Sequence, residues 1–156
     1  MSAAAIHCRG VTVRHEAHGP ATLEDVSFSL AEGERVALVG LNGSGKTTLL
    51  LALVGLAPHS GEITILGERL TRRTVARLRG EVGFLFNVPE DQLLFPKVIE
   101  DVAFGLVRRG LEVDRAMGRA QEVLDRLGVG ELAELPLHHL SHGQMQRVAL
   151  AGALVT

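Results

Sequence analysis

Residues 40–47 read GLNGSGKT, a glycine-rich loop that follows a short apolar run and precedes a helix-forming segment. The run at 35–40 is typical of a buried strand, and residues 46–53 predict a helix. A strand, a G-x-x-x-x-G-K-[ST] loop and a helix in this order form the pattern of a phosphate-binding loop. The order restricts the chain to an α/β architecture in which a strand delivers the loop to the start of a helix.

The loop has the chemistry that a polyphosphate requires. Glycines let the backbone curl so that its N–H groups converge as a nest for anions, and the helix that follows adds positive partial charge at its N-terminus. Lys46 would reach the β- and γ-phosphates, and the Thr47 hydroxyl would ligate Mg²⁺. The predicted nucleotide-binding residues here are Gly40, Leu41, Asn42, Gly43, Ser44, Gly45, Lys46, Thr47 and Thr48.

The alternative is a glycine-rich turn that binds nothing. A chance match in a chain of this composition is expected on the order of a few times in a thousand. The chain has 14 arginines and only two lysines, Lys46 and Lys97, and one of these two occupies the lysine position of the motif. We therefore predict nucleotide binding, with ATP and Mg²⁺ as the ligands.

Composition excludes several other classes of protein. The 156 residues suit a single domain, and a net charge of -2 gives no electrostatic basis for binding nucleic acid. Cys8 is the only cysteine, so an intrachain disulfide is impossible. No apolar stretch has the length of a membrane span. We expect a soluble intracellular domain whose membrane role, if any, comes through a partner.

Hydrophobic periodicity places the other elements. Residues 6–13, 26–30, 61–66 and 81–86 predict strands. Residues 98–107 and 113–127 carry apolar side chains at helical spacing, and a last helix is expected to begin at Ser141, a good N-cap residue. The expected order is strands around the loop and then a helical block.

Residues 140–144 read LSHGQ, which resembles the LSGGQ signature of ABC-type ATPases with His142 in place of one glycine. The resemblance implies that Ser141, Gly143 and Gln144 contact the γ-phosphate of an ATP held by a second ABC ATPase subunit. ATP would lie between the two copies of a homo- or heterodimer. Taken alone, the segment also fits an ordinary capped amphipathic helix.

Residues 88–105 read VPEDQLLFPKVIEDVAFG and resemble a segment of the ATPase subunits of cobalt, nickel and energy-coupling-factor vitamin importers. The resemblance implies a peripheral position on the cytoplasmic face of the membrane, beside a transmembrane subunit that docks near 98–107. Phe95 and Phe104 are the candidate exposed contacts, although this stripe also fits packing inside the domain. The alternatives are a non-catalytic ATP-binding regulatory module and a soluble ABC ATPase of translation or repair.

Some positions depart from the family pattern. His15 stands where relatives place an aromatic residue that stacks on adenine, and a solvent-facing loop histidine is the alternative. Asn87 stands where relatives carry the Q-loop glutamine, whose side chain approaches Mg²⁺. The asparagine side chain reaches about 1.5 Å less far than that of glutamine. We predict weaker coupling between the nucleotide and the membrane partner. His138 and His139 are neighbours that rarely converge on a metal.

The family's catalytic segment is the largest departure. In relatives a strand ending in Asp-Glu follows the signature helix, and a later strand ends in a histidine, but the sequence ends at Thr156. We assign no catalytic residue and expect inefficient hydrolysis by this chain alone. Without the flanking strands, the strand at 35–40 would have unpaired backbone groups.

The expected fold is a P-loop NTPase of the ABC ATPase type, incomplete at its C-terminus. Residues 1–156 form a partial nucleotide-binding domain. Within it, about 4–87 would form the ATP-binding β/α core, with an antiparallel β subdomain at its N-terminus. About 88–145 would form the α-helical subdomain that carries the signature.

Overall fold

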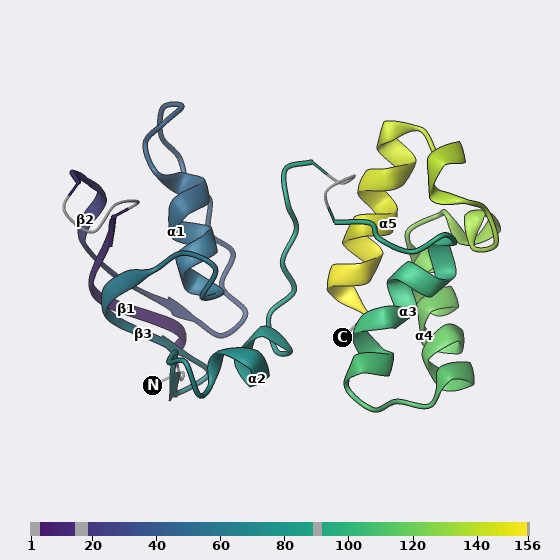
Figure 1. Ribbon diagram of the computed structural model, residues 1–156, viewed down its shortest axis with the longest axis horizontal. Helices are drawn as coiled ribbons and strands as arrows, with labels where there is room; N and C mark the ends of the chain where they lie inside the picture. Colours follow the sequence, from purple (N-terminus) through teal and green to yellow (C-terminus); the bar gives the residue numbers. More distant parts are fainter. Residues whose placement is uncertain (1–3, 15–18, 89–91, 156) are drawn as a thin grey trace. The chain divides into compact units, whose positions relative to one another are not determined.

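The computed structural model describes residues 4–14, 19–88 and 92–155 of the chain. It contains two compact units, Met1–Arg79 and Gly80–Thr156, and each is described by itself (Figure 1). Among the described residues, no helix combines the length and the apolar character that crossing a bilayer requires.

The first unit is built on an antiparallel sheet with strand order β2-β1-β3-β4. Its two helices lie in the connections after β2 and after β4. The elements are β1 (Ala4–Arg14), β2 (Ala21–Ala31), α1 (Lys46–Leu53), β3 (His59–Ile65), β4 (Glu68–Arg69) and α2 (Val75–Arg79). The expected strands at 6–13, 26–30 and 61–66 and the expected helix at 46–53 are confirmed.

A bulge in β1 sets which side chains enter the core of this unit. Cys8, Val11 and Val13 are all buried, although strict alternation would place Cys8 and Val11 on opposite faces. The pairing register of β1 shifts between Cys8 and Val11, and Gly10 has a φ of 59°, which glycine adopts without steric cost. The bulge therefore keeps one continuous apolar face beside Ile63 of β3 and the buried side of α1.

The strand expected at 35–40 does not form, and that prediction is wrong for this structure. Residues 34–41 have no strand pairing and are exposed, with Val39 at 87% and Leu41 at 85% exposure. A central strand needs hydrogen-bonding neighbours on both edges and cover on both faces. The described residues offer this segment none, so its apolar composition does not produce a strand.

The prediction of a strand at 81–86 is also wrong. The segment has no pairing partner among the described residues, and Leu85 and Phe86 are exposed by 45% and 40%. Gly83 instead lies against the end of a helix, where a Cβ at residue 83 would come 2.3 Å from the carbonyl oxygen of Ala153. The apolar residues of this segment thus pack partly on a helix.

The second unit is helical. Its elements are α3 (Val98–Arg108), α4 (Val113–Arg126), the short 3-10 helices η2 (Gly130–Leu132) and η3 (Leu137–His139), and α5 (His142–Leu154). The three helices expected from periodicity are confirmed. They share one core, which is formed by Val98, Val102, Ala103, Leu106, Ala116, Ala120, Val123, Leu124, Val129, Leu132, Ala133, Leu140, Val148, Ala151 and Val155.

Candidate nucleotide-binding site

The loop before α1 turns through two glycines in the left-handed region. Gly43 has a φ of 81° and Gly45 a φ of 89°, conformations that side chains strongly disfavour. Gly45 is also buried, and a Cβ there would lie 2.6 Å from Cδ2 of Leu23 and 3.2 Å from the carbonyl oxygen of Thr22. Glycine at 45 is therefore required both by the backbone turn and by the approach of the loop to β2.

Lys46 folds back over the loop. Its ammonium group donates to the carbonyl oxygens of Gly40 and Leu41, both at 2.7 Å, and lies 3.5 Å from the Ser44 hydroxyl. The Ser44 N–H donates to the Leu41 carbonyl at 3.1 Å, which closes the turn. The backbone of the loop thus holds the ammonium group of Lys46 beside residues 40 and 41.

Among the residues that the structure describes, no acid forms an ion pair with this charge. The ion pairs of the described residues are Arg77–Glu68, Lys97–Glu134 and Arg109–Glu81, so none involves Lys46. The N-cap of α1 is Gly45, and no side chain of the described residues caps this end. A lysine held by carbonyl and hydroxyl oxygens of the loop, beside the uncapped N-terminus of a helix, suits the oxygens of a phosphate group.

The remaining loop residues present polar groups to solvent. Asn42, Gly43, Ser44 and Thr47 are exposed, and Thr48 is half-buried. Thr47, in the first turn of α1, carries the hydroxyl predicted to hold Mg²⁺, which prefers such oxygen ligands. The donor set of this segment therefore fits ATP with Mg²⁺.

The predicted signature residues begin α5. Ser141 is the N-cap, and its hydroxyl oxygen accepts from the Gln144 N–H at 3.4 Å. The Gln144 side-chain oxygen accepts from the Ser141 N–H at 2.8 Å, which completes a capping box. Around Gly143 there is open space for a Cβ. The cap uses the Ser141 oxygen as an acceptor, so its hydroxyl hydrogen can still donate to an anion.

Within the second unit, one cavity brings two groups of predicted residues together. It has a volume of about 450 Å³ and is lined by Leu85, Phe86, Asn87, Gly143, Gln146, Arg147 and Leu150. Asn87, the predicted Mg²⁺ ligand, therefore lines the same cavity as Gly143 of the signature segment. Asn87 is exposed, and the phosphate loop belongs to the first unit.

Sequence reasoning missed Gln92. Its side-chain oxygen accepts from the Phe86 N–H at 3.1 Å, and its amide nitrogen donates to the Ala149 carbonyl on α5 at 3.4 Å. In the sequence, Gln92 is a polar residue five positions after Asn87 and belongs to no periodic pattern, so nothing there indicates its two hydrogen bonds. His15, predicted to stack on adenine, lies outside the described residues.

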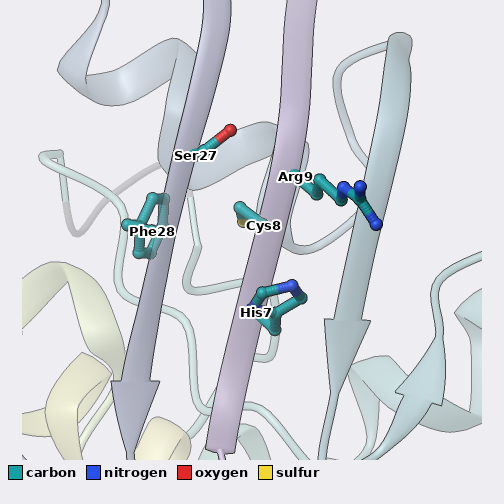
Figure 2. A pocket seen from close by; sticks show the side chains of 5 residues that line it. All are labelled: His7, Cys8, Arg9, Ser27 and Phe28. Atoms are coloured by element: carbon teal, nitrogen blue, oxygen red, sulfur yellow. The ribbon is translucent and has the colours of Figure 1, made fainter.

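Two other features hold none of the predicted ATP-binding groups. A shallow pocket of about 550 Å³ on β1 and β2 is lined by His7, Cys8, Arg9, Ser27 and Phe28 (Figure 2). Burial raises the pKa of the Cys8 thiol to about 11, which keeps it protonated and unreactive at neutral pH. The rings of His138 and His139 contact edge to face, and no group of three metal-binding side chains occurs among the residues described.

Comparison with known proteins places the chain in a family. The family model described as ABC transporter matches residues 23–156. The energy-coupling factor transporter ATP-binding protein EcfA of Methanosphaera stadtmanae is 43% identical over 139 residues, which cover 87% of this chain and 50% of that protein. The chain spans about half the length of the curated relatives it matches.

Solved structures of the same family have the same fold. CbiO1 from Clostridium perfringens, described as part of the ABC transporter complex cbiONQ, matches with a TM-score of 0.84 and 32% identity over 97% of this chain and 61% of that one. The ATP-binding cassette MJ0796, in a dimeric post-hydrolysis state bound to ADP and Pi, matches with a TM-score of 0.83 and 28% identity over 96% of this chain and 69% of that one. The fold is therefore that of an ABC ATPase, represented here by its antiparallel sheet, phosphate loop and helical unit. The chain belongs to the ABC transporter family of ATP-binding proteins.

Proposed function

We propose that this chain binds Mg·ATP at residues 40–48 and acts as the ATP-binding subunit of an energy-coupling-factor type importer. The observation that carries the proposal is the loop itself. Two left-handed glycines shape it, and Lys46 projects a charge that no carboxylate of the described residues neutralises. Bound Mg²⁺ would supply charge neutralisation to the phosphates, with Thr47 as its ligand. We keep Asn87 as a second proposed Mg²⁺ contact, because it stands where the family resemblance predicts a glutamine.

Similarity supports the transporter class. Relatives that match most of this chain are named as energy-coupling factor transporter ATP-binding proteins, and a structural neighbour comes from the cbiONQ complex. We extend these names to this chain as a proposal, with a metal ion such as cobalt or nickel, or a vitamin, as the solute class. The membrane subunits would determine which solute is transported.

The signature helix supports a paired assembly. Ser141 is held at the N-terminus of α5 by the capping box, and open space surrounds Gly143. A γ-phosphate brought by a second copy or by a homologous subunit would meet the Ser141 hydroxyl and the positive end of the α5 dipole. ATP would then join the two subunits.

An apolar patch on the second unit supports a membrane partner. We define the docking patch as Leu94, Phe95, Phe104, Val107 and Arg108. Leu94 is 77% exposed and Phe104 37% exposed. The Phe95 and Phe104 rings lie 4.7 Å apart, and the Arg108 guanidinium lies 5.7 Å from the centre of the Phe104 ring. The patch would receive a helix of the transmembrane subunit and hold this chain at the cytoplasmic face of the membrane.

Co-purification with the membrane subunits of an energy-coupling factor transporter tests this assembly. Phe104→Glu puts a charge into the docking patch and should reduce co-purification about tenfold, with Mg·ATP binding unchanged. Val113→Glu is the matched control, because Val113 is also an exposed apolar residue of the second unit but lies at the start of α4. Equal co-purification of both variants would exclude the docking patch as the contact.

A further inference from the structure

The amide of Gln92 joins two parts of the second unit. On one side it accepts a hydrogen bond from the Phe86 N–H, and on the other it donates to the Ala149 carbonyl in α5. A neutral amide can accept and donate at once, which a carboxylate or an apolar side chain cannot do. Gln92 is half-buried between the two groups.

Both ends of this bridge lead to predicted nucleotide contacts. Phe86 directly precedes Asn87, the residue at the Mg²⁺ position. Ala149 belongs to the same helix as the Ser141 cap, and a helix of this length moves as a rigid element. A displacement of residues 86–87 would therefore reach Ser141 through Gln92 and α5.

The link between residues 82–88 and α5 combines hydrogen bonds and packing. Among the residues that the structure describes, the Gln92 side chain joins residues 82–88 to α5 through two hydrogen bonds. Gly83 approaches Ala153 by packing. Asn87 and Gly143 both line the cavity of about 450 Å³. Side chains that line a cavity are not fully packed against one another, so packing alone would transmit a displacement of residues 86–87 to α5 incompletely.

We propose that Gln92 is a positioning residue that makes the segment before Asn87 and the signature helix move together, so that nucleotide binding at one ATP site is felt at the residues that contact the other. The inference rests on the proposed function, because Asn87 and Ser141 would face different ATP molecules in the paired assembly. Gln92 itself touches no nucleotide in this account.

Two substitutions separate the two hydrogen bonds. Gln92→Met keeps the length of the side chain and removes both bonds. Gln92→Glu, studied at about pH 8, where the carboxylate is ionised, keeps an acceptor for the Phe86 N–H but loses the donor to Ala149. Without nucleotide, Gln92→Met should speed hydrogen exchange of the Phe86 amide about five- to tenfold, whereas Gln92→Glu should not.

The decisive measurement is amide hydrogen exchange of the whole chain with and without Mg·ATP, at a concentration where light scattering shows a single copy. In the parent, we expect slower exchange both at 40–48 and at 142–144. In both Gln92 variants, the change at 40–48 should remain and the change at 142–144 should fall to less than about a third of the parent's.

Each outcome decides a separate point. A full response at 142–144 in the variants, or no response there in the parent, would overturn the role of Gln92 while leaving nucleotide binding intact. A parent that shows no response at 40–48 would contradict the proposed function, and this inference with it. If Gln92→Met unfolds, Gln92→Glu alone still tests the bond to Ala149.

Discussion

At the scale of single residues, Asn87 stands where the family resemblance predicts the Q-loop glutamine. An asparagine side chain is shorter than glutamine by about 1.5 Å, so it cannot ligate Mg²⁺ directly from a backbone placed for glutamine. Asn87→Gln restores the reach. We expect about a tenfold rise in ATP hydrolysis or transport by the assembled complex, measured as phosphate release or solute uptake. Unchanged rates in Asn87→Gln would refute a role for side-chain length here.

The local chemistry of the loop could be predicted from the sequence because it depends on neighbours in the chain. Gly43 and Gly45 supply positive φ angles, and Lys46 follows them directly. The hydrogen bonds of Lys46 span no more than six positions. Gln92 could not be predicted in this way, since its bond to Ala149 spans 57 positions and depends on tertiary packing.

At the scale of elements, Asp101 fixes the backbone of the residues that precede α3. Its carboxylate accepts from the Leu94 N–H at 2.7 Å and the Phe95 N–H at 3.0 Å, which places the start of the docking patch. Burial raises the pKa of Asp101, and these two N–H groups oppose the rise. The folded state therefore binds this proton more tightly than the unfolded chain does.

The sign of the pH dependence follows from this shift. Below the ordinary pKa of 3.8, the contribution of Asp101 to stability is fully present, and it is lost as pH rises through the raised pKa of the folded state. Asp101→Asn keeps an acceptor for both N–H groups and does not ionise. The free energy of unfolding of Asp101→Asn, relative to the parent, should rise between about pH 4 and about pH 7 in urea titrations. A pH-independent difference would rule out this contribution.

The helices followed from sequence more reliably than the strands. Helical hydrogen bonds are local, so apolar spacing and the Ser141 cap were enough to predict α3, α4 and α5. A strand takes its hydrogen bonds from other segments. The segments at 35–40 and 81–86 have strand-like composition, but the described residues supply them with no pairing partners.

At the scale of the whole molecule, neither the sheet nor the helical core of the described residues includes the apolar segment at 35–40. Val39→Thr should change the free energy of unfolding by less than about 0.5 kcal/mol, because Val39 is 87% exposed. Val11→Thr is the matched control, since Val11 is fully buried in β1, and it should cost about 2 kcal/mol. Urea unfolding of the two variants measures both values. Equal costs would show that the segment at 35–40 is buried in solution.

If residues 40–48 hold Mg·ATP through Lys46, as proposed, the two lysines of the chain should behave differently on substitution, and their comparison is the most direct test. Calorimetric titration of the parent with ATP in the presence of Mg²⁺ should show saturable binding. Lys46→Ala should weaken this affinity about 100-fold, because it removes a charge-assisted bond to phosphate. Lys97→Ala should leave the affinity unchanged, since Lys97 pairs with Glu134 in the second unit. A parent without affinity for Mg·ATP, or a Lys46→Ala chain that binds it as tightly as the parent, would contradict the account.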